Sequence, residues 1–476
     1  MADLKDVKDF IITWNEENTQ DFYDTEKFIW EHPELSMQEF ESSKALMDLL
    51  EKYGFSVESG VAGMPTAFIA TYGEGKPVIG INAEYDALPG LSQDGEKLEK
   101  SVLIQGAPGQ GCGHNLLGTG GVKAAIAVRE AIEKFELKGT VKVFGSPAEE
   151  LCLGKPYMGR AGCYDGVDAF LDWHPWSYTK ANYDSCQAYF SKKYHFKGRT
   201  SHGNSPWHGR SALDAGQLMG HAIDILREHI YPGNPPDAAN TINYTYTSTG
   251  PEFPSVVPDY TTVWVIGRFE TTEEMLRSLA RVDKCAQAGA LATETTVEEE
   301  VITITHHKIP NKVLAEKFYR NLQTIGVPQF TEEEHNKAKA IQKQLGQPEN
   351  GLPTKLDPFE GGFTVLCDTS EFSWCAPYAS PWIAMGMTGC GWHNWGVVRC
   401  AGDTMGQKSL DCAAKAISLT AADILCDEDV LPAAQAEWKE RMGDRKYECL
   451  LPEGQQPPVG LNKDIMDKYR LFIDRR

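Results

Sequence analysis

The spacing of apolar positions predicts an alternation of strands and helices in the first 175 residues. Four short apolar runs are typical of buried strands, and they lie at 66–71, 77–82, 140–145 and 169–173. Apolar residues at near-helical spacing predict two helices in the first 55 residues, with a break at His32-Pro33, and another helix at 116–134. Such alternation indicates an α/β fold, with a mostly parallel sheet covered by helices.

A different pattern begins near residue 188. A strand with alternating apolar positions at 189–196 is followed by an amphipathic helix at 211–228. Two more strands, a second helix and a last strand follow, at 240–246, 261–269, 272–290 and 295–305. The order β-α-β-β-α-β is that of a ferredoxin-like unit. We therefore expect an inserted α+β domain at 188–305.

The rest of the chain returns to the first pattern. It contains one predicted strand and two predicted helices, at 381–386, 405–425 and 432–442. A length of 476 residues suits two domains. We expect 1–187 and 306–476 to form one α/β domain that the α+β domain interrupts.

Charge and composition narrow the classes of function. The formal net charge of −21 argues against nucleic acid or an anionic membrane as a partner, because both require clustered Lys and Arg. The first 20 residues lack the pattern of a signal peptide, and no apolar run approaches the roughly 20 residues that span a bilayer. Twelve irregularly spaced cysteines indicate reduced thiols. We expect a cytoplasmic protein.

Metal-ligand side chains occur in four short clusters near predicted strand ends or a helix start. The clusters are 111–115 with Cys112 and His114, 146–150 with Glu149 and Glu150, 172–176 with His174, and 391–395 with His393. Each cluster alone has an ordinary explanation, such as a solvated turn or a packed histidine. Because α/β proteins place their sites at the carboxyl ends of strands, the four together predict one shared site.

The combined set suits the hydrolysis of an amide bond. That reaction needs a polarised carbonyl group and a nucleophile that is available at neutral pH. Two divalent ions about 3.5–4 Å apart supply both, by Lewis acidity and by lowering the pKa of bound water. One carboxylate must stay unligated to move the proton. The adjacent pair Glu149 and Glu150 offers one carboxylate for each task.

Three other classes of protein compete with this interpretation. A cysteine hydrolase with Cys112 as nucleophile and His114 as base leaves the other ligand-type residues unexplained. A nucleotide-binding protein is suggested by GTGGVK at 118–123, but this run is neither a dinucleotide fingerprint nor a P-loop. An inactive scaffold would have no need of the full set of ligand-type residues.

The sequence resembles the aminoacylase/carboxypeptidase family of metallopeptidases with two co-catalytic metal ions. Within it, the chain is similar to the amidohydrolase branch that carries a bridging cysteine. The phrases that match are EYDAL at 84–88, GCGHNLLG at 111–118 and GRSALDA at 209–215, and the resemblance covers nearly the whole chain. It implies a hydrolase of N-acyl or N-aroyl amino acids that binds two divalent ions per subunit, Zn²⁺ or Mn²⁺. It also implies a dimer, either of two identical chains or with a paralogous subunit.

The resemblance further implies a role for each candidate residue. The metal ligands would be Cys112 as the bridge, His114, Glu150, His174 and His393. Glu149 would be the general base and acid, and Asp86 would orient a metal ligand. In the inserted domain, His202 would stabilise the oxyanion in the site of a partner chain. Arg268 could hold the substrate carboxylate or form a structural salt bridge.

Two positions depart from the pattern of the branch. Asn115 replaces the usual Asp, which leaves the partner of His114 open, and Ser255 stands where Asn is frequent. Other histidines are expected to lie outside the site: His306 and His307 as surface residues, and His221 and His229 in solvent. Four tryptophans flank the motifs and suit either an aromatic substrate or ordinary packing, namely Trp173, Trp176, Trp207 and Trp392.

Overall fold

The computed structural model describes residues 3–234 and 238–473. The chain begins with three helices, α1 (Leu4–Glu17), α2 (Gln20–Glu31) and α3 (Phe40–Lys52). The predicted break at His32-Pro33 is confirmed as the end of α2. A second break, at Asn18, was not predicted. The side-chain amide of Asn18 donates to the Trp14 carbonyl at 2.9 Å, a local bond that competes with continuation of the helix.

A six-stranded sheet forms the centre of the main unit. Its strands are β1 (Ser56–Ser59), β2 (Phe68–Glu74), β3 (Val78–Ala83), β4 (Gly139–Gly145), β5 (Ala169–Leu171) and β13 (Tyr378–Ala379). Their order is β1-β2-β4-β3-β5-β13. The four strands from β4 to β13 are parallel, and β1 and β2 add an antiparallel edge. The predicted α/β class with a mostly parallel sheet is confirmed.

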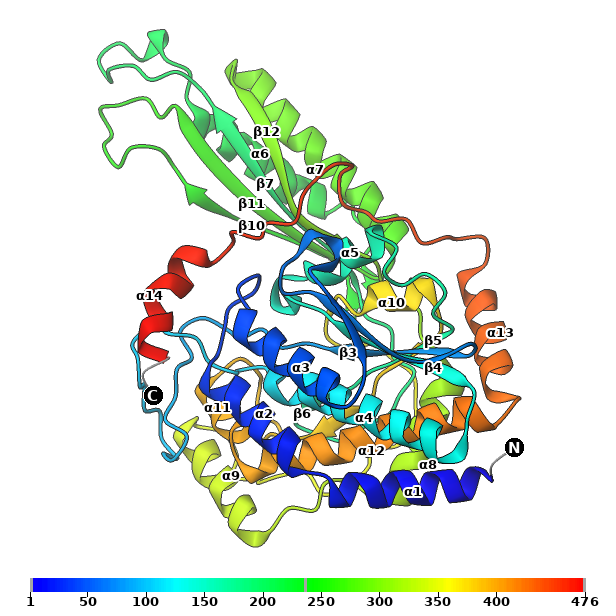
Figure 1. The fold of residues 1–476 in the computed structure, drawn as a ribbon. Helices are drawn as coiled ribbons and strands as arrows, with labels where there is room; N and C mark the ends of the chain where they lie inside the picture. The colour runs from blue at the N-terminus through cyan, green and yellow to red at the C-terminus, as the bar shows by residue number, and fades with distance from the viewer. Residues whose placement is uncertain (1–2, 235–237, 474–476) are drawn as a thin grey trace.

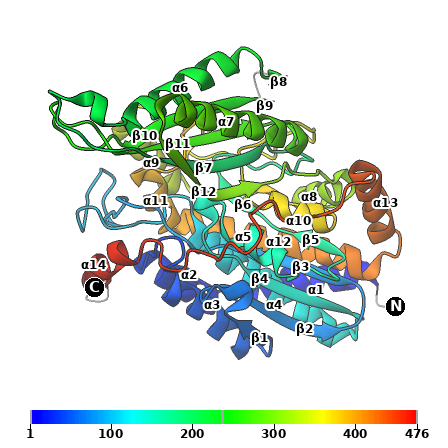
Figure 2. The ribbon, with the colours of Figure 1, turned by 90° about the horizontal axis from the view of Figure 1, so that it is seen from above.

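Helices cover both faces of this sheet (Figures 1 and 2). Alternation along β4 directs Val141 and Val143 to one face, where they pack in the same cluster as residues of α4 (His114–Phe135) and α12 (Thr404–Cys426). Phe144 points to the opposite face, where α5 (Gly154–Arg160) and α10 (Ser370–Cys375) lie. The carboxyl ends of β3, β4 and β5 are thereby fixed within one rigid layer.

The inserted unit forms a second sheet with its own core. Its elements are β7 (Ala188–Lys197), α6 (Ala212–Arg227), β8 (Gly233–Asn234), β9 (Ala238–Ala239), β10 (Thr241–Ser248), β11 (Tyr260–Phe269), α7 (Thr272–Thr293) and β12 (Thr296–Thr305). The strand order β10-β11-β7-β12 is antiparallel throughout. The predicted β-α-β-β-α-β unit is confirmed, and the short β8–β9 pair is an addition. The domain boundaries at 187/188 and 305/306 stay a prediction.

Each face of this second sheet has a different role. Phe190, Val263 and Val265 point toward α6 and α7 and pack in one apolar cluster. Alternation therefore places Tyr189 and Arg268 on the other face, where both line a cleft against the main unit. The unit extends away from the main unit in Figure 1.

Several shorter elements complete the main unit. The helices are α8 (Lys312–Ile325), α9 (Glu332–Gln344), α11 (Trp395–Ala401), α13 (Val430–Met442) and α14 (Lys463–Ile473). The predicted strand at 381–386 is shorter, β14 (Trp382–Ala384), and pairs in parallel with β6 (His174–Trp176) outside the main sheet. No helix within 3–234 or 238–473 is long and apolar enough to cross a membrane.

The chain from 443 to 473 runs back across the molecule. It leaves α13, passes the base of the inserted unit and ends at α14 on the other side (Figure 1). Gln455 donates to the Val301 carbonyl of β12 at 2.9 Å. Further along, the Val459 carbonyl accepts from Gln38 at 3.0 Å. This C-terminal segment thus contacts both the inserted unit and the turn before α3.

Candidate metal centre

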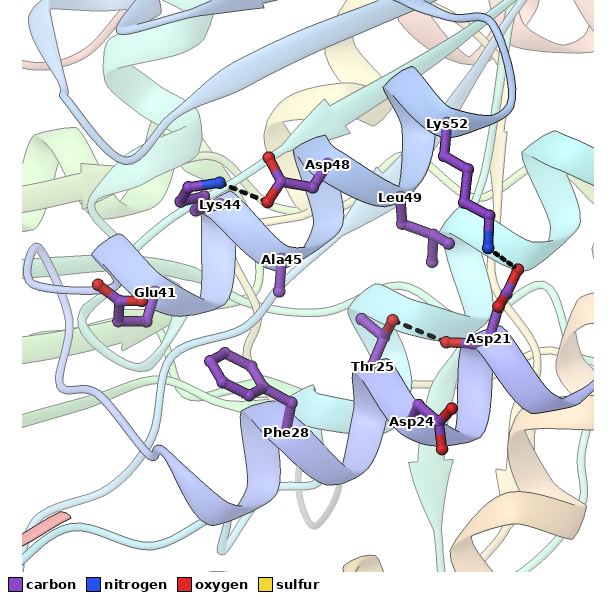
Figure 3. Close-up of a pocket in the computed structure, with 10 residues that line it drawn as sticks. All are labelled: Asp21, Asp24, Thr25, Phe28, Glu41, Lys44, Ala45, Asp48, Leu49 and Lys52. Atoms are coloured by element: carbon purple, nitrogen blue, oxygen red, sulfur yellow. Dashed lines mark hydrogen bonds and ion pairs between the residues drawn. The ribbon is translucent and has the colours of Figure 1, made fainter. Parts of the chain in front are cut away.

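A cleft of about 740 Å³ lies between the two units. The main unit lines it with Cys112, Glu149, Glu150, His174 and His393, and the inserted unit with residues that include Tyr189, Ser191, Trp264 and Arg268. A second hollow of about 490 Å³ lies between α2 and α3 (Figure 3). It is lined by exposed opposite charges such as Lys52 and Asp21, 2.5 Å apart. Residues from all four predicted clusters of metal-ligand side chains thus line the first cleft.

The two adjacent glutamates sit in a tightly held turn after β4. Ala148 has a left-handed backbone (φ 58°) and opens a short 3-10 turn, Glu149–Leu151. Its N–H donates to Glu39 Oε1 at 2.8 Å, and the N–H of Glu150 donates to Asp86 Oδ2 at 3.1 Å. Glu39 and Asp86 are themselves buried. Two buried carboxylates thus fix the backbone that carries both glutamates into the cleft.

Cys112 and His114 are placed by the start of α4. Gly113 between them has φ 83°, a conformation that favours glycine, and a Cβ there would make a tight contact of 3.0 Å with the Pro175 ring. His114 Nδ1 lies 3.0 Å from Asp86 Oδ1. The other ring nitrogen, Nε2, is buried and has no hydrogen-bond partner among the described residues.

His174 and His393 approach from two other segments. In β6, Nδ1 of His174 lies 2.7 Å from the Pro175 carbonyl, which leaves Nε2 directed at Cys112 Sγ, 3.6 Å away. His393 precedes α11 with a left-handed φ of 62°, and its N–H donates to the Gly111 carbonyl at 3.1 Å. Its Nε2 lies 3.5 Å from Glu150 Oε2. Cys112 therefore stands between two pairs of possible ligands.

The donor atoms fit two metal ions that share Cys112. The groups Cys112/His114/His174 and Cys112/Glu150/His393 each bring their ligand atoms within 4.8 Å of one another. Zinc–sulfur and zinc–nitrogen bonds of about 2.3 and 2.05 Å at a tetrahedral angle place sulfur and nitrogen about 3.6 Å apart. The Cys112–His174 separation has this value. His114 Nε2 and Glu150 Oε1 have no hydrogen-bond partner within the described part of the chain, and bound ions would supply one.

Electrostatics favour cations in this cleft. Burial raises the pKa of Glu149 well above its usual range, and the neighbouring carboxylate of Glu84 adds to the effect. Burial also raises the pKa of Glu150 to about 7. It lowers the pKa of His174 to about 4, so this ring is neutral at pH 7, the form that binds metal. Positive charge bound here would offset the cost of the buried carboxylates.

Sequence reasoning missed a buried charge network beside the ligands. Lys155 Nζ lies 2.7 Å from Glu84 Oε1 and 2.5 Å from Asp368 Oδ1, and all three side chains are fully buried. Glu84 Oε2 lies 3.6 Å from His114 Nε2. The position of Glu84 at the end of a buried strand, two residues before Asp86, was a usable signal. Nothing in the local sequence marked the other two residues.

Arg268 lines the cleft of its own chain, whereas His202 is not among the described residues that line it. Arg268 lines the cleft with its guanidinium 5.6 Å from the Tyr189 ring, and no described residue forms an ion pair with it. The role of Arg268 stays a prediction. His202 is exposed on the loop that bridges to Val256, and it is absent from the described residues that line the cleft. Its Nδ1 accepts from the Asn204 N–H at 3.0 Å.

The replacement of the usual Asp by Asn115 leaves His114 supported. Asn115 Nδ2 donates to Glu26 Oε2 at 3.0 Å and to the Ala401 carbonyl at 3.2 Å, while Asp86 contacts the His114 ring. Asn115 thus pairs with a carboxylate on α2 instead of serving the histidine. The other departure, Ser255, accepts from the Gly203 N–H at 2.6 Å, in the loop next to His202.

The surface role predicted for His306 and His307 is wrong, because both are buried. They follow β12 where the chain returns to the main unit, and α10 covers them there: His306 Nδ1 lies 2.9 Å from Glu371 Oε1, and His307 stacks edge-on against Trp374. His221 and His229 are exposed, as predicted.

The four tryptophans beside the motifs separate into three environments. Trp173 is fully buried and donates to the Leu117 carbonyl at 3.0 Å, so it packs the core. Trp207 is 68% exposed in the same loop region as His202. Trp176 and Trp392 line the cleft.

Comparison with known proteins assigns the family. Residues 80–372 match peptidase family M20/M25/M40. The chain is 33% identical to one subunit of the p-aminobenzoyl-glutamate hydrolase of Escherichia coli, over 95% of this chain and 99% of the relative. The chain belongs to this peptidase family. The resemblance expected from the sequence is confirmed, and the M20 chain is a metal-dependent hydrolase of amide bonds.

Two further comparisons support the same conclusion. The mouse Xaa-Arg dipeptidase is 26% identical to the M20 chain, over 88% of this chain and 89% of the relative. The Bacillus subtilis YXEP protein, a dinuclear metal binding peptidase from the M20 family, has a similar fold with a TM-score of 0.56. It is 18% identical and covers 85% of this chain and 97% of its own.

Proposed function

We propose that this M20 hydrolase cleaves the amide bond of N-acyl or N-aroyl amino acids, of the kind exemplified by p-aminobenzoyl-glutamate. One observation carries the proposal. A single cleft holds two groups of metal-ligand atoms joined at Cys112, with the carboxylate of Glu149 beside them and the cation of Arg268 on the facing wall. The name of the E. coli relative supports the substrate class.

The metal ligands in this proposal are the five residues at the centre of the cleft. His114 and His174 would hold one ion and Glu150 and His393 the other, with Cys112 shared. Two divalent ions held there would polarise the amide carbonyl and make a water nucleophilic at neutral pH. Mixed sulfur, nitrogen and oxygen ligands suit Zn²⁺, and Mn²⁺ is the alternative where it is more available.

Glu149 is the proton carrier in this mechanism. Its Oε2 lies 3.6 Å from His114 Nε2. Glu84, His114 and Glu149 also bring ligand atoms within 4.8 Å of one another, but the proposal assigns the ions to the two groups that share Cys112, which leaves the Glu149 carboxylate free. It would take a proton from the attacking water and deliver it to the nitrogen of the departing amine. Asp86 and Glu39 would act as positioning residues, because they hold the backbone on both sides of Glu149.

Two residues of the inserted unit complete the proposed site. The guanidinium of Arg268, which has no ion-pair partner among the described residues, would bind the carboxylate of the amino acid through two parallel hydrogen bonds. His202, exposed away from its own cleft, would stabilise the oxyanion in the cleft of a partner chain. The partner would be a second copy or a paralogous subunit, and the latter is supported by the E. coli relative, which is named as a subunit of its enzyme.

An amino-acid release assay with metal removal tests the proposal. The chain is stripped with a chelator, reloaded with Zn²⁺ or Mn²⁺, and given N-acetyl, N-benzoyl and N-(4-aminobenzoyl) amino acids. We expect no release after stripping and recovery on reloading, with two ions bound per chain by elemental analysis. Undiminished activity in fully stripped protein would contradict it and would favour a cysteine hydrolase.

A further inference from the structure

We infer that an aromatic cluster in the cleft binds an aryl ring, so that the preferred substrates of the proposed reaction are N-aroyl and not N-alkanoyl amino acids. The aromatic cluster consists of Trp176, Tyr178, Trp382 and Trp392, all of which line the cleft. The inference rests on the proposed function, since it names the acyl group that the same site takes.

Trp176 is the centre of the aromatic cluster. Its ring lies 4.6 Å from that of Trp392 at an interplanar angle of 30°, and 4.9 Å from that of Trp382 at 66°. Tyr178 lies 6.2 Å from it. Four rings from two strands and two loops thus form one continuous aromatic surface. Such surfaces bind a further ring by offset stacking or edge-to-face contact.

The aromatic cluster is not ordinary core packing. Trp173, three residues before Trp176, is fully buried with its indole N–H bonded, as expected for a core residue. Trp176, Tyr178 and Trp392 are only half-buried, and their remaining surface faces the cleft. Aromatic surface left in contact with water in a concave site is typical of a ligand pocket.

The backbone fixes the aromatic cluster next to the metal ligands. Trp382 pairs with His174 in the β14–β6 ladder, and their rings lie 5.1 Å apart. Trp392 directly precedes His393, and its indole N–H donates to the Cys112 carbonyl at 3.1 Å. An aryl ring on this surface would therefore lie next to the metal-ligand residues, as the ring of an aroyl amide must when its carbonyl group is held there.

The opposite wall of the cleft would orient the other end of the substrate. Arg268 and Tyr189 belong to the inserted unit, whereas the aromatic cluster belongs to the main unit. An N-aroyl amino acid can thus place its ring on one wall, its amide at the ligands and its carboxylate on the other wall. A short alkanoyl group would leave the aromatic cluster in water and lose that part of the binding.

A ratio of two substrates tests the inference within one protein preparation. For the metal-loaded dimer or complex, kcat/KM is measured for N-(4-aminobenzoyl)glutamate and for N-acetylglutamate. We expect the wild-type protein to prefer the aroyl substrate. Trp176→Leu should lower the ratio about tenfold or more, because the ring contacts act only on the aryl group. Trp176→Phe should retain most of the ratio.

Trp30→Leu is the matched control. Trp30 is also half-buried and has its indole N–H bonded, to the Val398 carbonyl at 2.8 Å, but it does not line the cleft. Its substitution should leave the ratio unchanged, whatever it does to folding. A wild-type preference for the acetyl substrate, or an equal loss on both substrates in Trp176→Leu, would overturn the inference.

Binding of 4-aminobenzoate separates this inference from the proposed function. Calorimetry with the metal-loaded protein should show binding that Trp176→Leu weakens about tenfold or more. If neither amide is hydrolysed, the proposed function fails, and the binding measurement alone decides whether the aromatic cluster holds an aryl ring. Equal affinity of the wild-type and Trp176→Leu proteins, or no binding to either, would overturn the inference.

Discussion

Glu149 and Glu150 are neighbours in one turn, yet they face different partners. Glu150 Oε2 lies 3.5 Å from His393 Nε2 and belongs to a group with Cys112, whereas Glu149 belongs to neither such group. We expect Glu149→Gln to keep both ions and lose about 10²–10⁴-fold in kcat. Glu150→Gln should lose metal affinity as well. Metal titration by calorimetry beside kinetics checks this, and the reverse pattern of metal loss would mean that the two roles are exchanged.

The buried position of Lys155 leads to a prediction about the stability of the fold. It lies between the fully buried carboxylates of Glu84 and Asp368, so Lys155→Met removes the cation that pairs with both. Breaking such a buried network costs roughly 3–5 kcal/mol in the free energy of unfolding. Denaturant unfolding measures it, with Lys44→Met as the control. Lys44 pairs with Asp48 at the surface, so its substitution should leave the free energy of unfolding nearly unchanged.

The same residues show how much of the site could be predicted from the sequence. The ligand candidates were found because each stands beside an apolar run or a glycine-rich turn that marks a strand end or helix start. Lys155 and Asp368 carry no such mark, because the contact between them joins positions 213 residues apart. Arg268 could be proposed from its strand, but whether it has an ion-pair partner depends on what the fold brings near it.

At the scale of elements, long periodic segments were predicted well, whereas the short strands β6 and β13 were not predicted. The helices at 405–425 and 272–290 correspond to α12 and α7, since their amphipathic patterns are set locally. The two- and three-residue strands β13 and β6 exist only because each finds a parallel partner far along the chain. α14 has a strong amphipathic pattern too, but the surface it covers could not be read from the sequence.

α14 supports the metal centre indirectly, through two chain segments that it contacts. Met466 and Tyr469 pack against Leu35 and Ala107, and Arg470 lies 3.0 Å from Glu34 Oε1. Residue 107 belongs to the loop that leads to the first ligand, and residue 35 to the turn before α3. Neither residue is itself a proposed metal ligand.

Ending the chain after residue 462 should therefore loosen the ligands without unfolding the sheet. We expect metal affinity to fall about 10–100-fold, as for other losses of ligand support. Hydrogen exchange should rise at 34–38 and 104–109 but not in β3 and β4. Leu471→Ser, at a side chain with 64% exposure on the same helix, is the control and should change neither. Full affinity in the shortened chain would show that α14 does not support the ligands.

At the scale of the whole molecule, His202 raises the question of assembly. It is exposed in a loop of the inserted unit and does not line the cleft of its own chain. β10 also forms an edge of the second sheet, and pairing with another chain would cover that edge. Two-fold dimers are the commonest assembly. We therefore expect a dimer in which each chain completes the other's site.

Complementation between inactive variants tests this. Glu149→Ala and His202→Ala chains are co-expressed, so that about half of the dimers are mixed if pairing is random. Each mixed dimer then has one cleft with both residues intact, and about a quarter of all sites should work. Each variant alone is the control and should be inactive. An inactive mixture, with mixed dimers verified by mass spectrometry, would show that His202 does not act across the interface.

The path of the C-terminal segment has a consequence for the order of events during biosynthesis. Asn462 donates to the Ser36 carbonyl at 3.0 Å, and Ser36 donates to Asp86, which contacts His114. The contacts that support the ligands are thus completed by Asn462, which is synthesised more than 400 residues after Ser36. A nascent chain on the ribosome can form β3, β4 and α4 early, but the last support arrives only when residues beyond 460 have left the exit tunnel. Tight metal loading should accordingly follow the emergence of residues beyond 460.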